Sequence, residues 1–269
     1  MPDDWKPEAD LPPILRGKEM TEPSAFAPEA MLREARRQRG IAFAPVPEFC
    51  MLDPDGDIVR YLIAAGRARR HPAWACYHTE LYAFEHEGVS CGIIGSAVGA
   101  AFAVLVAEEL FASGCRLLLS MTSAGQIRPV QDPPYFIVID RALRDEGTSY
   151  HYVPPSDYSV ADRALVRLAR EALSGDRALQ IGATWTTDAP FRETAGAIAA
   201  AREAGILAVE MEAAALYAFA AACKRPVLCF AHVTNQMGRI EGDFEKGASN
   251  GAEAALDLML RIIERWRKA

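Results

Sequence analysis

The chain has 269 residues, of which 51% are hydrophobic, and a formal net charge of −7. This length supports one large domain better than two. The acidic balance argues against nucleic acid or an anionic membrane as the main partner. The six cysteines form no C-x-x-C pair, and no basic or apolar leader pattern is visible, so we expect a cytoplasmic protein with reduced thiols and no metal site.

Residues 1–46 are rich in proline and lack strand-like alternation, which predicts an extended N-terminal arm in front of a domain at 47–269. Within the arm, Pro28 suits a first helical turn and Gly40 suits a stop, so we expect one helix over 28–39. The arginines of this helix predict a solvated or subunit-facing basic face. The role of the arm is open at this stage.

Strand and helix signals alternate after residue 47. Apolar runs predict strands at 48–52, 77–87, 89–95, 115–121, 135–140, 180–186, 205–209 and 226–234, and helices at 98–113, 159–173, 213–223 and 248–268. Residues 122–126 are predicted as a loop at a strand end, where open α/β sheets bind ligands. Because most strands are apolar throughout, the pattern predicts an α/β fold, a single-domain three-layer α/β/α sandwich around a mixed β-sheet.

Two carboxylates stand inside apolar sequence at a predicted strand-to-helix junction. Glu210 and Glu212 flank Met211 there. An unpaired buried carboxylate must shift its pKa or lose several kcal/mol, so each should have a partner. Two interpretations are open from the residues alone: both acids cap the following helix, or they bind a ligand.

The run Val-Glu-Met-Glu followed by small residues resembles the signature of the nucleoside phosphorylase-I family, which includes uridine phosphorylase, hexameric purine nucleoside phosphorylase and methylthioadenosine-type nucleosidases. The resemblance extends from about Pro47 to the C-terminus. It implies a nucleoside phosphorylase-like fold, with Met211 under the ribose, Glu212 on its 2′- and 3′-hydroxyls and Glu210 beside them. A carboxylate suits a vicinal diol because it only accepts hydrogen bonds.

On the nucleophile side, the resemblance implies an anion site built by Gly95, Gly99 and Ser123. The arginines that the family uses for phosphate have no counterpart in this alignment. Ser120 stands in place of the strand-end arginine, Ala83 near the arginine that a neighbouring subunit supplies, and Arg60 is out of register. Each lost charge-assisted bond is worth about 1.5–3 kcal/mol.

The turn 53–58 replaces the family's Gly-Asp-Pro-x-Arg turn. Its Asp55 or Asp57 is a candidate general base if water is the nucleophile, because the family's hydrolases carry an acid in this turn.

The segment that lies over the base in the family corresponds to 186–193 here. The resemblance implies that Thr187 and Phe191 contact the base, and that Arg192 donates to a pyrimidine carbonyl as charge develops there. The structural alternative is a loop phenylalanine beside a solvent-facing arginine. Asn235 replaces the acid that protonates purines in relatives, which favours a pyrimidine, and His151 is a further polar candidate.

The function that the resemblance implies is cleavage of a ribonucleoside N-glycosidic bond by phosphorolysis, as in uridine phosphorylase, with Arg192 and Asp57 as the expected catalytic residues and no metal or cofactor. The expected partners are a nucleoside, inorganic phosphate and further copies of the chain, as a dimer or a hexamer built from dimers. Two alternatives stay open: a nucleosidase that uses water, and a non-catalytic nucleoside-binding protein.

Overall fold

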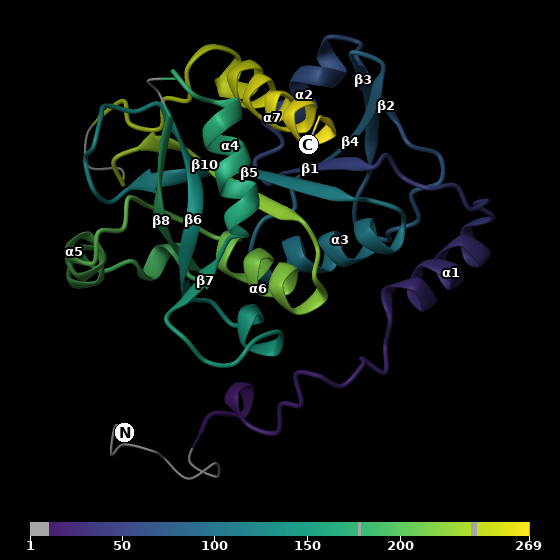
Figure 1. The fold of residues 1–269 in the computed structure, drawn as a ribbon, viewed down its shortest axis with the longest axis horizontal. Helices are drawn as coiled ribbons and strands as arrows, with labels where there is room; N and C mark the ends of the chain where they lie inside the picture. The colour runs from purple at the N-terminus through teal and green to yellow at the C-terminus, as the bar shows by residue number, and fades with distance from the viewer. Residues whose placement is uncertain (1–10, 177–178, 238–240, 269) are drawn as a thin grey trace.

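The computed structural model describes residues 11–176, 179–237 and 241–268. A mixed ten-stranded sheet runs through it, with helices on both faces (Figure 1). The strands are β1 (Phe49–Asp53), β2 (Ala68–Arg70), β3 (Tyr82–His86), β4 (Val89–Gly95), β5 (Leu117–Gln126), β6 (Tyr135–Asp145), β7 (Tyr158–Val160), β8 (Leu179–Thr187), β9 (Ala208–Glu210) and β10 (Val227–Asn235).

The α-helices are α1 (Pro28–Arg39), α2 (Asp57–Ala64), α3 (Ala100–Ala112), α4 (Arg163–Ala172), α5 (Ala195–Glu203), α6 (Ala213–Cys223) and α7 (Ala252–Arg267). Short 3₁₀ turns are η2 (Pro13–Leu15), η3 (Thr148–His151), η4 (Pro190–Arg192) and η5 (Ala248–Gly251). Within the described ranges, no helix has the length and apolarity that a membrane crossing needs.

The order of strands in the sheet is β10-β6-β8-β9-β5-β1-β4-β3-β2, and β7 pairs with β6. Because β10 also pairs with β5, strands β5, β9, β8, β6 and β10 form a closed ring. Strand β9 runs antiparallel to β5, with Gly125 opposite Val209. Strand β9 therefore ends beside the last residues of β5, which brings residues 210–212 to the C-terminal end of β5.

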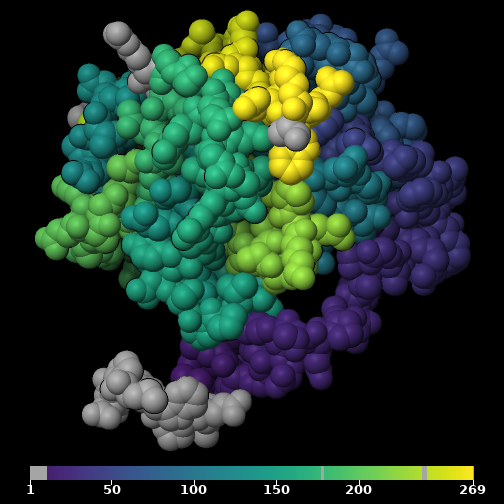
Figure 2. Space-filling view, viewed as in Figure 1, coloured from purple at the N-terminus to yellow at the C-terminus, as the bar shows by residue number. Residues whose placement is uncertain are grey.

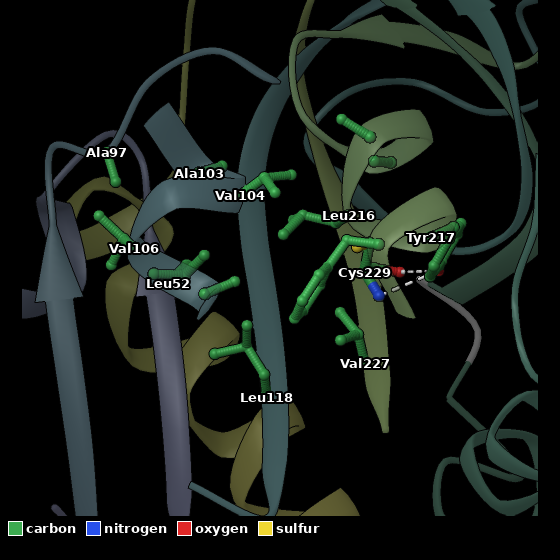
Figure 3. Close-up of a cluster of buried hydrophobic side chains, with 14 of the residues drawn as sticks. Leu52, Ala97, Ala103, Val104, Val106, Leu118, Leu216, Tyr217, Val227 and Cys229 are labelled. Atoms are coloured by element: carbon green, nitrogen blue, oxygen red, sulfur yellow. Dashed lines mark hydrogen bonds between the residues drawn. The ribbon is translucent and has the colours of Figure 1, made fainter. Parts of the chain in front are cut away.

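The two faces of the sheet carry separate cores. In β1, Cys50 and Leu52 pack with α3 and α6, whereas Phe49 and Met51 pack with α2, α4 and α7. This follows from the alternation of side chains along a strand. Figure 3 shows the first core, where the Tyr217 hydroxyl joins α6 to the backbone of β10. The expected three-layer sandwich is confirmed.

The helix expected at 28–39 is confirmed as α1, and it ends at Gly40 in the left-handed conformation with a φ of 65°. Leu32 and Ala35 are buried against a group that includes Ala75. On the N-terminal side of α1, the arm runs away from the α/β domain and contacts it again where η2 packs on η3, as Figure 2 shows in purple.

Several expectations about local structure are wrong. The strand expected at 77–87 begins only at Tyr82, and the strand expected at 205–209 lies at 208–210. Residues 122–126 are not a loop but the continuation of β5, because β10 and β9 both supply backbone partners there. The helix expected at 159–173 begins only at Arg163, because 158–160 form β7 and the Asp162 side chain caps the helix by accepting from the Ala164 N–H at 2.6 Å.

Glu210 fastens the junction between β9 and α6. Its Oε1 accepts from the hydroxyls of Thr184 at 3.0 Å and Thr186 at 2.5 Å, and its Oε2 accepts from the N–H groups of Glu212 and Ala213, both at 2.7 Å. Burial raises the pKa of Glu210, and these donors oppose that shift. A single carboxylate thus joins β8 to the first turn of α6 and caps that helix.

Glu210→Ala should lower the free energy of unfolding by about 2–4 kcal/mol, because it removes a cap and leaves buried hydroxyls without their acceptor. Urea unfolding followed by circular dichroism measures the change. Glu203→Ala, at the exposed end of α5, is the matched control. A Glu210→Ala protein within about 0.5 kcal/mol of wild type would contradict this role.

Candidate active site

Glu212 is a buried carboxylate that the protein satisfies only on one side. It is 1% exposed, and its Oε1 accepts from the Gly99 N–H at 2.7 Å. Its Oε2 is buried, and although Thr122 and the Met211 backbone lie near the carboxylate, no described residue reaches Oε2 with hydrogen-bond geometry. Burial, followed by the charge of Glu210, raises the pKa of Glu212 to about 8, although the Gly99 amide and the Thr122 hydroxyl oppose the shift.

The glycine turn after β4 places the donor for Glu212. Gly99 precedes the first residue of α3 and has a φ of 89°, a conformation that favours glycine. Gly95 packs closely on the neighbouring turn, since a Cβ there would lie 3.3 Å from the Gly56 Cα. The turn predicted to bind an anion therefore gives its Gly99 amide to Glu212.

Asp55 holds the donors of Ser123. Its Oδ1 accepts from the Ser123 hydroxyl at 2.9 Å and its Oδ2 from the Ser123 N–H at 3.1 Å. Ser123, which we expected on the nucleophile side, therefore has both of its donors bound by an internal carboxylate. Thr122, the preceding residue of β5, faces Glu212, so adjacent residues of one strand connect the two carboxylates.

Asp57 begins α2 and is surrounded by donors. It accepts from the Lys246 ammonium at 2.6 Å, from the Arg60 guanidinium at 2.7 Å and from the Asn250 amide at 3.4 Å. Burial raises the pKa of Asp57, but the charges and hydrogen bonds of Lys246 and Arg60 outweigh it and lower the pKa below its ordinary value. Asp57, expected as a catalytic residue, is therefore tied into ion pairs.

The shape of the turn 53–57 comes from Asp53, which is 2% exposed. Its carboxylate accepts from the N–H groups of Gly56 at 3.1 Å and Val59 at 2.9 Å. Burial raises the pKa of Asp53 to about 6. Arg60 folds back over this turn and donates to the Asp55 carbonyl at 2.9 Å, so the arginine that the alignment leaves out of register still reaches the site.

Sequence reasoning missed Lys246. Its ammonium lies 3.1 Å from Asp55 Oδ2 and 2.6 Å from Asp57 Oδ2. It belongs to the segment between β10 and α7, 189 residues away from Asp57 along the chain. No motif surrounds it, and only the tertiary fold brings it to the turn.

The residues expected to contact the base lie beyond β8. Thr187 is buried and its hydroxyl accepts from the Ala189 N–H at 3.2 Å. Phe191 is 98% exposed and Arg192 is also exposed. Neither side chain packs into the core, whereas Met211 is half-buried next to Glu212.

The remaining two candidates have contacts within the protein. Asn235 accepts from the Met237 N–H at 2.9 Å and donates to the Ala124 carbonyl at 3.4 Å, which closes the end of β10 on β5. His151 is exposed in η3, and its Nδ1 lies 2.6 Å from the ammonium of Lys18 in the arm. Partial burial, and then Lys18, lower the pKa of His151.

One group of side chains in the described ranges has metal-ligand spacing. His86, Glu87 and Glu264 offer ligand atoms within 4.8 Å of one another, at the β3–β4 turn and on α7. His86 Nε2 already lies 2.8 Å from Glu264 Oε1. None of the residues predicted for the active site belongs to this group.

Comparisons with known proteins agree with the fold. The family model of the phosphorylase superfamily matches residues 56–264. The chain is 25% identical over 236 residues to a uridine phosphorylase from Thermococcus kodakarensis, covering 78% of this chain and 84% of the relative. It is 26% identical over 215 residues to a guanosine phosphorylase from Halorubrum lacusprofundi, covering 76% and 88%.

Among solved structures, a uridine phosphorylase from Vibrio fischeri superimposes with a TM-score of 0.69 at 19% identity, over 81% of this chain and 93% of that one. The same enzyme complexed with 6-hydroxy-1-naphthoic acid gives a TM-score of 0.71 at 18% identity, over 83% and 93%. The family match over most of the sequence and the shared fold lead to one conclusion: the chain belongs to the phosphorylase superfamily.

Proposed function

We propose that this protein cleaves the N-glycosidic bond of a ribonucleoside, and that Glu212 accepts hydrogen bonds from the ribose 2′- and 3′-hydroxyls. The observation that carries the proposal is Glu212 Oε2, which is buried without a partner in the described structure. Leaving a buried acceptor unpaired costs about 1–3 kcal/mol, and more for a charged group. A vicinal diol supplies the donors that this oxygen lacks.

The uridine and guanosine phosphorylases among the relatives support nucleoside chemistry. Phe191 and Arg192 remain our candidates for the base, as a stacking face and a donor. Their exposure is consistent with a segment that packs only when a base or a second copy of the chain covers it. A homo-oligomer is part of this proposal.

The geometry around Ser123 favours water over phosphate as the nucleophile. Phosphate would need the Ser123 hydroxyl and amide, and Asp55 already occupies both. Around that point, the carboxyl groups of Asp53, Asp55 and Asp57 outnumber the cations Lys246 and Arg60. A phosphate dianion placed there would be repelled by the carboxylates. Phosphorolysis, the activity named for the relatives, is the second candidate.

In the proposed hydrolysis, Asp55 acts as the general base. It takes a proton from water as the water oxygen bonds to C1′ of the ribose, and the electron pair of the C1′–N bond leaves with the base. Arg192 stabilises the charge that develops on the departing base. The departing base takes up a proton from solvent and Asp55 returns its proton to solvent, so free ribose and free base are the products.

The direct test is product analysis after incubation with uridine, thymidine, inosine and methylthioadenosine, with and without phosphate. We expect free ribose from a ribonucleoside at a rate that does not depend on phosphate. Asp55→Asn should lower that rate by about 10²–10⁴-fold, while Asp257→Asn on the exposed face of α7 should leave it unchanged.

Ribose 1-phosphate formed only with phosphate would overturn the water mechanism and establish phosphorolysis. No product from any nucleoside, together with a nucleoside-dependent rise in the melting temperature, would instead indicate a binding protein without activity.

The pH dependence of stability tests the state of Glu212. Its pKa is about 8 in the folded protein against an ordinary value of 4.5. Between these values the folded state holds a proton that the unfolded chain has released, so the free energy of unfolding falls as the pH rises from about 4.5 to about 8. Glu212→Gln removes this loss.

We therefore expect the stability of Glu212→Gln relative to wild type to increase by on the order of 3 kcal/mol between about pH 5 and about pH 8. Urea unfolding of both proteins at the two pH values measures it. A difference that stays constant with pH would mean that Glu212 is not held as a buried acid.

A further inference from the structure

Residues 246–251, which lead into α7, are docked on the turn that carries Asp55 and Asp57. Lys246 contacts both carboxylates, and Asn250 donates to Asp57 at 3.4 Å. At the end of the segment, Gly251 has a φ of 72° and packs on His232 so closely that a Cβ would lie 2.2 Å from the imidazole Cε1. These contacts fix the segment beside β10.

His232 forms the other side of this contact. It pairs in register with Ser123 across β10 and β5, and its ring stacks on Phe136 with a centroid distance of 4.5 Å. Burial, followed by the charge of Lys246, lowers the pKa of His232 to about 4, so its ring is neutral at pH 7. Lys246 is then the cation that this segment brings to the Asp55 carboxylate.

The two aspartates differ in their contacts and in their exposure. Asp57 has an exposed side-chain fraction of only 10% and accepts from Lys246, Arg60 and Asn250, which makes it an anchor. Asp55 has an exposed side-chain fraction of 29%, and among the described residues its Oδ1 accepts only from the Ser123 hydroxyl. The ammonium of Lys246 is therefore anchored on Asp57 and directed at Asp55 Oδ2.

We propose that Lys246 is a positioning residue, which holds the Asp55 carboxylate on Ser123 in the orientation that activates the nucleophile. The inference rests on the proposed hydrolysis. Because Lys246 contacts the two aspartates on the proposed nucleophile side, its removal should change kcat and leave the KM for the nucleoside nearly unchanged. A lysine in the β10–α7 segment thereby becomes part of the nucleophile side.

The experiment compares Lys246→Met, Lys246→Arg and Asp57→Asn with the surface control Lys268→Met, on a nucleoside that the wild-type protein hydrolyses. Lys246→Met should lower kcat by about 10–100-fold with a KM within about threefold of wild type. Lys246→Arg should recover most of kcat. Adding Asp57→Asn to Lys246→Met should cause little further loss, because the two residues act as one unit.

Melting temperatures of all variants show whether folding is affected. A wild-type kcat in Lys246→Met, or a loss that Lys246→Arg does not restore, would overturn the inference while the hydrolysis by wild type stands. Formation of ribose 1-phosphate by the wild-type protein would instead overturn the proposed nucleophile, and with it the basis for this role of Lys246. The two failures are thus distinguished by the wild-type product alone.

Discussion

The structure of the site depends on the hydrogen bonds that Glu210 accepts. Two threonine hydroxyls of β8 and two backbone amides of α6 converge on its carboxylate. Because these donors come from separate elements, they fix where β9 ends and how α6 begins. Glu212, two residues after Glu210, is then directed into the core, where it accepts from the amide of Gly99. A structural carboxylate therefore places a second carboxylate that the protein leaves half satisfied.

The same division recurs at the end of β1. Asp55 and Asp57 are also two residues apart at a strand-to-helix junction. Here the second residue accepts from three side chains and is 10% exposed, while the first binds Ser123 and Lys246 and is 29% exposed. In both pairs, one acid is held by several donors, and the other is the one that we propose to face the ligand. Burying acids in this way lowers stability unless a ligand compensates for it, which is a common property of functional sites.

Much of the fold follows from local signals. The apolar run 89–95 gives β4 with the expected bounds, and the alanine-rich run 213–223 gives α6. The interpretation of 122–126 as a loop failed because Thr122, Ser123 and Gly125 are small or polar, and only the pairing with β10 and β9 keeps them in a strand. The local sequence does not show which distant strands will pair with a segment.

The candidate site was only partly predictable, because several of its contacts also join residues that are far apart in the sequence. The signature motif points to both Glu210 and Glu212, and the ribose role of Glu212 stays a prediction. That Glu210 is instead a structural residue depends on hydroxyls from β8 that the motif does not contain. Lys246 was not predictable, since its contact with Asp57 joins residues 189 apart. Asp57 was expected as a catalytic acid or base because sequence alone cannot tell a carboxylate that is held in ion pairs from one that is available.

The central claim is that Glu212 recognises the ribose diol. The most direct measurement is the ratio of kcat/KM for a ribonucleoside to that for its 2′-deoxy counterpart, in wild type and in Glu212→Gln. Above about pH 8, where Glu212 is ionised, one charge-assisted hydrogen bond of about 1.5–3 kcal/mol predicts a ratio of roughly 10–150 in wild type, falling toward one in the variant. A ratio that is unchanged by Glu212→Gln would contradict the claim, because the 2′-hydroxyl would then be recognised by another group.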